Sequence, residues 1–537
     1  MGWVRTQSCR DYDPSVARLP WPIMLNWFDV LLLSGLAAPS AVVDGSRLWA
    51  AGMLLRACYG ILEARSTMPG GLNHAPPLQR GEPPLHPRRS RVALTASERI
   101  KPEDRRGTVF PVPGTQEAAL PAVALYGSNA SGKSGVLEAL CCMSGLVVNS
   151  HTEMKPVSLI LQQPFLLDRD SSTKPTRLEC TFTLSHGKEL SSSGQATEEV
   201  QPVYTYGFKY TQKGICEEWL YQEAVEEYQD SQLLFRRTTV NQEIILKIGS
   251  QLSGENEIIK KLTRPNNLFL SAAAQNNHPQ LLRVYKYFFK MMFMKDPESV
   301  REHLIADRFS KLGNQETLKD ILQQADIGIT DIVVKKLDLP EDQVKIVRDL
   351  SEIIPQIISK HISFPFEAKV TSPGSMLAKH LGFIHSTADG EPRTLGYDLE
   401  SRGTQVFLTL LLPALEALSE GSLLVIDELD TSLHPDLSQA FLSLFHRKAS
   451  NPHGAQLLFS THDVTLLDSD VLEQDEIWFT DKDPDGASRL TPLTDFKLPD
   501  QLRHGDIEQA YRLGRFGGVP NSRDFQVELN ADQEEEE

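Results

Sequence analysis

Residues 124–140, ALYGSNASGKSGVLEAL, place a glycine-rich loop between an apolar run and an amphipathic segment. The preceding run, LPAVALYG, predicts a buried strand, and GVLEALCCMSGLV after the loop has apolar side chains at helical spacing. The pattern G-x-x-x-x-G-K-[ST] is fitted by Gly127, Ser128, Asn129, Ala130, Ser131, Gly132, Lys133 and Ser134. Such a loop points backbone N–H groups at phosphate oxygens. We expect Lys133 to neutralise the β- and γ-phosphates and the Ser134 hydroxyl to bind Mg²⁺.

A second candidate site lies where the apolar run 423–426 ends in two acids, Asp427 and Glu428. We expect Asp427 to hold the Mg²⁺ shell, and Glu428 to polarise a water for in-line attack on the γ-phosphate. Two solvated acids at the end of a strand would give the same local pattern. The phosphate loop in the same chain favours the magnesium site.

Three neighbours of this strand complete the pattern. Ser401 and Gly403 begin an apolar helix, whose N-terminus is a candidate anion site. If that helix faces the γ-phosphate of a nucleotide held by another subunit, ATP joins two subunits into a dimer. Asp430 lies in the turn after Glu428, and His462 ends the run LLFSTHD, where an imidazole can sense the γ-phosphate. A surface or core role is the alternative for this histidine.

The composition limits the class of protein. The chain has 537 residues, 40% hydrophobic residues and a formal net charge of −17, with an acidic end. This charge disfavours nucleic-acid binding unless one face is locally basic, so DNA or RNA contact stays open. The six cysteines form no CxxC pairs, which argues against a disulfide framework or a zinc site and fits a reducing cytoplasm.

The pattern along the chain indicates an α/β fold interrupted by an insertion. We expect a poorly ordered N-terminal extension over 1–90, whose apolar run is broken by polar residues and predicts no membrane span. Residues 91–263 predict the first part of a P-loop NTPase head, with the phosphate loop and antiparallel strands. A mainly helical lobe is expected over 264–392, the second part of the head over 393–500, and a C-terminal segment with an acidic tail over 501–537.

The order of these motifs resembles the ABC-type ATPase head, and more narrowly the stand-alone bacterial ABC-like ATPases called AAA family proteins. These occur in abortive-infection and other anti-phage systems beside a separate effector. The resemblance runs from about residue 91 to 520 and is carried by YGSNASGKS, NNLFLSAAAQNNHPQL, ESRGTQ, LLVIDELDTSLHP, FSTHD and DIEQAYRLGRFGGVP. It implies ATP and Mg²⁺ as cofactors, an ATP-dependent homodimer or higher oligomer, and an effector protein as partner.

The sequence departs from this family at two points. The usual first strand of the type F-x-V-x-N-F-x-S is missing before LTASERI, and the signature reads ESRGT, with Arg402 between serine and glycine. Arg402 either contacts a phosphate of the second subunit or points to solvent.

Four other classes compete with this interpretation. The short tail after His462 lacks the carboxylate cluster of an overcoming-lysogenization-type nuclease. Long heptads typical of SMC-type DNA-repair heads are absent from the sequence. A non-hydrolysing binding module conflicts with the intact set of Lys133, Ser134, Asp427 and Glu428. An ABC transporter ATPase subunit stays open.

Overall fold

The computed structural model describes residues 91–519, apart from 102–104, 106, 113–116, 168–170, 185–201, 224–230, 301, 314, 326, 339–376, 388, 469 and 497–506. The described residues all belong to one compact unit, composed of 58–353 and 363–537. The expected extension over 1–90, the acidic tail and residues 339–376 of the expected helical lobe lie outside the described residues.

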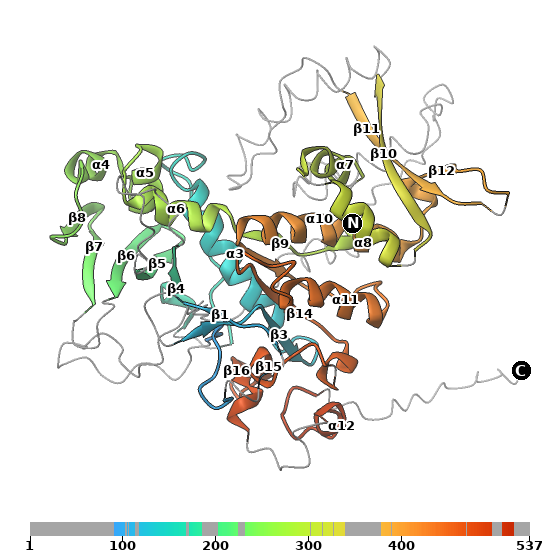
Figure 1. Cartoon of the computed structure of the whole chain (residues 1–537). Coiled ribbons are helices and arrows are strands. Elements are labelled where there is room, and N and C mark those ends of the chain that lie inside the picture. Colours follow the sequence, from blue (N-terminus) through green and yellow to red (C-terminus); the bar gives the residue numbers. More distant parts are fainter. Residues whose placement is uncertain are drawn as a thin grey trace, which may run out of the picture. The chain divides into compact units, whose positions relative to one another are not determined.

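A six-stranded sheet carries the phosphate loop (Figure 1). Its strand order is β16-β15-β3-β14-β13-β9, in which β16 alone runs antiparallel to its neighbour. The strands are β3 (Ala122–Gly127), β9 (Met292–Met294), β13 (Leu423–Ile426), β14 (Gln456–Ser460), β15 (Ile477–Lys482) and β16 (Ser488–Pro492). Strands from both predicted parts of the head therefore pair directly, which confirms the α/β fold with a parallel sheet.

The central strand β3 is buried on both faces, as a continuous apolar run predicts for a parallel sheet. Val123 and Leu125 contribute to one hydrophobic core, whereas Ala122, Ala124 and Tyr126 contribute to the other. Helix α3 (Lys133–Asn149) belongs to the first core. Helices α10 (Arg402–Glu420) and α11 (Pro435–His446) belong to the second, so helices cover both faces of the sheet.

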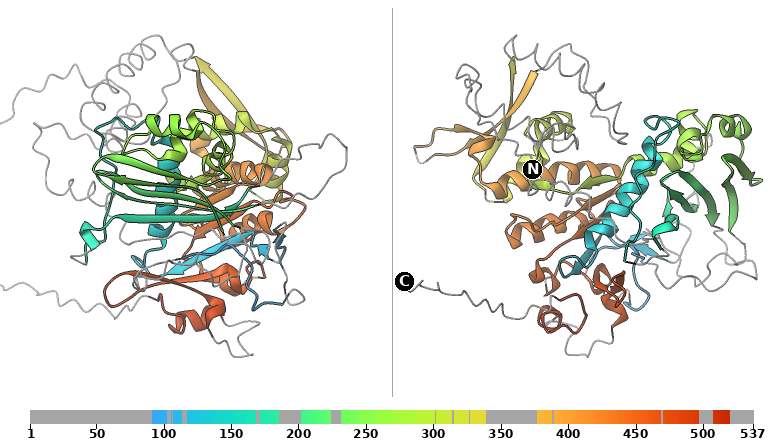
Figure 2. Two further views of the ribbon diagram at one scale, coloured as in Figure 1. Left: turned by 90° about the vertical axis from the view of Figure 1, so that its left-hand side faces the viewer. Right: turned by 180° about the vertical axis from the view of Figure 1, so that it is seen from behind.

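An antiparallel sheet packs into the same core as α3 (Figure 2). Its five strands follow each other in chain order and lie within 91–263, where antiparallel strands were expected. They are β4 (Thr176–Thr183), β5 (Val203–Thr211), β6 (Gly214–Glu223), β7 (Gln232–Val240) and β8 (Glu243–Ile248). The helices that follow are α4 (Asn256–Leu262), α5 (Phe269–Gln275) and α6 (Leu281–Phe289).

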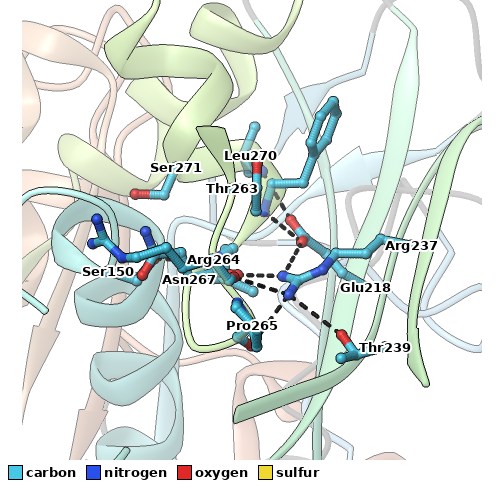
Figure 3. A network of polar contacts seen from close by, with 12 residues as sticks. Ser150, Glu218, Arg237, Thr239, Thr263, Arg264, Pro265, Asn267, Leu270 and Ser271 are labelled. Carbon is cyan, nitrogen blue, oxygen red and sulfur yellow. Dashed lines mark hydrogen bonds and ion pairs between the residues drawn. The ribbon is translucent and has the colours of Figure 1, made fainter. Parts of the chain in front are cut away.

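A buried ion pair joins this antiparallel sheet to α5 (Figure 3). Glu218 and Arg237 are fully buried, and the Glu218 carboxylate accepts hydrogen bonds from the N–H groups of Phe269 and Leu270 at 2.6 and 2.9 Å. Arg237 donates to backbone carbonyls of the loop before α5, including Arg264 O at 3.2 Å. Burial raises the pKa of Glu218, and the charge of Arg237 opposes that shift.

The interval 264–392 differs from the mainly helical lobe that we expected. Helices α7 (Glu302–Lys311) and α8 (Gln315–Gln324) form there, but β10 (Ile329–Asp338) and β11 (Leu377–His385) pair antiparallel, and β12 (Arg393–Gly396) extends that sheet. In addition, α5 and α6 pack on α3, and β9 pairs with β13 in the main sheet. These elements belong to the head because their apolar side chains join its core.

Two short elements complete the described chain. The hairpin of β1 (Phe110–Pro111) and β2 (Ala118–Ala119) follows the segment LTASERI. Helix α12 (Ile507–Arg512) begins directly after residues 497–506, which the structure does not describe. None of the helices in the described part of the chain combines the length and apolar composition that a membrane span needs.

Candidate nucleotide site

The phosphate loop connects β3 directly to α3, as the sequence predicts. Gly127 and Gly132 have φ values of +157° and +113°, and a Cβ atom on either residue would collide with a neighbouring side chain. The neighbours are Thr480 of β15 at Gly127 and Ser488 of β16 at Gly132. Glycine is therefore required at both ends of the loop by backbone conformation and by close approach.

Lys133 lies at the start of α3 and folds back over the loop. Its ammonium donates to Gly127 O at 2.8 Å and to Ser128 O at 3.3 Å. Burial lowers the pKa of Lys133, and the opposing carboxylates are those of Asp427, Glu428 and Asp430. The structure thus brings the predicted cation close to the predicted acids.

The two acids after β13 have different environments. Asp427 is buried, and its N–H donates to Met294 O at the end of β9 over 2.8 Å. Glu428 has a φ of +55° and an exposed side chain. A buried carboxylate beside Lys133 suits a metal ligand, whereas an exposed one suits contact with a water molecule.

Ser460 connects these acids, and sequence reasoning missed it. Its hydroxyl accepts the Glu428 N–H at 2.8 Å and donates to Asp427 Oδ1. Ser460 ends β14, which pairs with β13 in register, Ile426 opposite Phe459. The feature of the sequence that indicates Ser460 is its position: it is a small polar residue at the end of the strand that follows the acidic strand.

Asp430 positions the loop that carries His462. The Asp430 Oδ1 atom accepts from the Thr461 hydroxyl at 2.7 Å and from the His462 N–H at 3.0 Å. The imidazole of His462 is exposed. Phosphate loop, acids and histidine follow β3, β13 and β14 at their carboxyl ends, where α/β sheets bind ligands.

The start of α10 lies beside the turn that follows Glu428. Ser401 is the N-cap of this helix and accepts from the Thr404 N–H at 3.1 Å. A Cβ atom on Gly403 would lie 3.0 Å from Ser432 O. Ser401 and Gly403 thus lie beside the turn after β13, whereas the phosphate loop follows β3.

Glu298 joins the start of α10 to this turn, and no sequence motif indicates it. Arg402 makes an ion pair with Glu298 at 3.3 Å, and the Ser432 hydroxyl donates to the same carboxylate. The hydrogen bond from Ser432 is the main cause that lowers the pKa of Glu298, and Arg402 adds to it. Arg402 therefore has a partner within its own chain.

Solved structures of SMC heads are among those similar to this chain. The SMC head bound to the C-terminal winged-helix domain of ScpA is 12% identical with a TM-score of 0.34, covering 71% of this chain and 94% of that chain. The SMC head with an extended coiled coil bound to ScpA from Pyrococcus furiosus is 13% identical with a TM-score of 0.27, covering 72% and 96%. The SMC head domain from Thermotoga maritima is 11% identical with a TM-score of 0.26, covering 73% and 97%.

No curated protein matches the chain by sequence. A family model described as "AAA domain, putative AbiEii toxin, Type IV TA system" matches residues 122–468. The chain belongs to this AAA domain family.

Proposed function

We propose that this AAA domain protein binds ATP with Mg²⁺ and hydrolyses it to ADP and phosphate. The observation that carries the proposal is the convergence of Lys133, Asp427 and Glu428 at the carboxyl ends of β3 and β13, two strands of one parallel sheet. The loop fits a phosphate group, because its glycines leave no room for side chains and its lysine lies over it. Ser134 and Asp427 would hold Mg²⁺, which when bound would supply positive charge to the phosphates.

Each residue of the site has a distinct role in this proposal. Lys133 binds the β- and γ-phosphates, while Ser134 and Asp427 hold Mg²⁺. Glu428 accepts a proton from the attacking water, and His462 contacts the γ-phosphate from the neighbouring loop. Asp430 keeps that loop in place through its two hydrogen bonds.

A dimeric switch is the second part of the proposal. The N-terminus of α10, with Ser401 and Gly403, would cap the γ-phosphate of a nucleotide bound to a second copy of the chain. Two observations support this: Ser401 is exposed, and it caps a helix of 19 residues. The N-terminus of such a helix carries a partial positive charge that attracts phosphate. Hydrolysis then removes the bridge and loosens the dimer.

The biological proposal is an ATPase component of a bacterial anti-phage, abortive-infection system that controls a separate effector in the cytoplasm. Its support is the family description, which names an AbiEii toxin and a toxin–antitoxin system. An SMC-like DNA-repair head and an ABC transporter subunit are the alternatives. Co-purification with an effector would favour the first role, and co-purification with a membrane permease would favour the last.

The test of hydrolysis compares Lys133→Ala with Glu428→Gln. Lys133→Ala should lose nucleotide binding, whereas Glu428→Gln should retain ATP and slow turnover by about 10²-fold or more. Turnover of Glu428→Gln at the parent rate would contradict the proposed base.

The test of the switch is sedimentation of Glu428→Gln with and without ATP. We expect ATP to strengthen self-association, and Ser401→Arg to block it while nucleotide still binds the Lys133 side. Normal ATP turnover by Ser401→Arg would refute the shared site.

A further inference from the structure

Residues 507–519, here called the C-terminal strap, begin at the loop that carries His462. The strap starts with α12, whose first N–H groups donate to the Asp468 carboxylate, from Ile507 at 2.8 Å and from Glu508 at 3.2 Å. Asp468 ends the short helix η6 (Val464–Asp468), which closely follows His462. One end of the strap is therefore fixed to the histidine loop.

Aromatic side chains anchor the middle of the strap on the main sheet. The rings of Tyr511 and Phe516 stack on Phe479 of β15, with centroids 5.2 and 5.1 Å apart. Tyr511 also contacts Tyr126 edge-on, with centroids 6.2 Å apart. Tyr126 is the residue directly before the phosphate loop, and its hydroxyl donates to Asp463 O, next to His462, at 3.2 Å. These rings bring the strap to both loops of the candidate site.

The other end of the strap touches the phosphate loop through its backbone. Gly518 has a φ of +69°, and a Cβ atom there would lie 2.9 Å from Thr480 O and 3.3 Å from Gly127 Cα. The Tyr511 hydroxyl holds this turn by donating to Gly518 O at 3.1 Å. A residue larger than glycine would push against the first residue of the loop.

Thr480 extends this contact across the loop. Its hydroxyl donates to Tyr126 O at 2.8 Å and is hydrogen-bonded to the Ser131 hydroxyl at 2.7 Å. Thr480, which Gly518 closely approaches, thus contacts the chain just before the phosphate loop and also Ser131 within the loop.

We infer that the C-terminal strap is a positioning element of the nucleotide site, which holds the phosphate loop and the histidine loop in register. The inference rests on the proposed nucleotide function. Gly127 supplies the carbonyl that contacts the Lys133 ammonium, so a shift of Gly127 displaces that cation. A loop rich in glycine loses much conformational freedom when it closes on phosphate, and a preformed loop avoids part of that cost. Gly518 is a positioning residue in this scheme.

The test uses Gly518→Ala with Gly514→Ala as the matched control. Gly514 lies in the same strap with a φ of +73°, but a Cβ atom there meets none of the described residues within 4 Å. Both variants carry the same left-handed strain, and only Gly518→Ala presses on the phosphate loop. We expect the dissociation constant for Mg²⁺ with adenylyl imidodiphosphate to rise about tenfold in Gly518→Ala and to stay at the parent value in Gly514→Ala. Equal binding by the two variants would overturn the inference.

Two further measurements keep the test decisive. Hydrogen exchange of the peptide 126–134 without nucleotide should be faster in Gly518→Ala than in Gly514→Ala. A parent protein that fails to bind the analogue would refute the proposed function, whereas hydrogen exchange still decides whether the strap holds the loop.

Should Gly518→Ala not fold, Tyr511→Phe removes only the hydrogen bond to Gly518 O, and it should weaken analogue binding about threefold at an unchanged melting temperature. Parent-like binding by Tyr511→Phe would then overturn the inference.

Discussion

Ser460→Ala should impair the candidate site more than its small size suggests. The hydroxyl of this fully buried serine makes two hydrogen bonds, one from the Glu428 N–H and one to Asp427. Alanine removes both hydrogen bonds and introduces no new bulk. We expect Asp427 to lose its fixed orientation and the strained backbone at Glu428 to relax.

The magnitude follows from the two partners. A hydrogen bond to a charged group contributes about 1.5–3 kcal/mol, and a buried N–H left without an acceptor costs about 1–3 kcal/mol. Because water can replace part of these bonds at the exposed Glu428, we expect the free energy of unfolding to fall by roughly 2–4 kcal/mol. Loss of a group that orients a metal ligand lowers metal affinity or activity by about 10–100-fold.

The assay is ATP turnover titrated with Mg²⁺, together with urea denaturation. Ser438→Ala is the matched control, because Ser438 is equally buried but its hydroxyl has no hydrogen-bond partner among the residues that the structure describes. The control should turn over ATP like the parent and be about as stable. If Ser460→Ala needs no more Mg²⁺ than Ser438→Ala and turns over equally fast, Ser460 does not support the acids.

Arg237→Met should lower the free energy of unfolding by about 3–5 kcal/mol, because it leaves a buried carboxylate without its cation. Arg236→Met next to it breaks a pair whose arginine is exposed, worth about 0–1 kcal/mol. Equal urea midpoints of the two variants would contradict this difference. Glu298→Ala should weaken ATP-driven self-association without reducing nucleotide binding, as sedimentation and dialysis can show, while Glu420→Ala at the other end of α10 should leave both unchanged. Burial, with nearby carboxylates, raises the pKa of Glu117 to about 7, so the folded state retains a proton that the unfolded chain releases above pH ~4.3. The urea midpoint of the parent should therefore fall as pH rises from about 4.3 to 7. The midpoint of Glu117→Gln should fall less across the same range.

Local sequence was sufficient for the parts of the site that lie within one strand–loop–helix unit. The phosphate loop and the acids after β13 were predicted from spacing alone, and the structure places them at strand ends as expected. Their conformations depend on near neighbours in the chain, such as glycines that adopt positive φ and apolar runs that favour buried strands. The antiparallel strands after residue 176 were predictable for the same reason.

Tertiary structure decided the features that join distant segments. The three residues of β9 continue a helical pattern in the sequence, yet they pair with β13 at the edge of the main sheet. Ser460, Glu298 and Gly518 are ordinary residues by sequence, and each matters through a partner far away in the chain. Periodicity tells which face of an element is buried but not which element covers it, because that choice depends on how all the apolar faces pack together. The sequence by itself therefore determined the phosphate loop and the acids, and only packing decided which residues hold them in place.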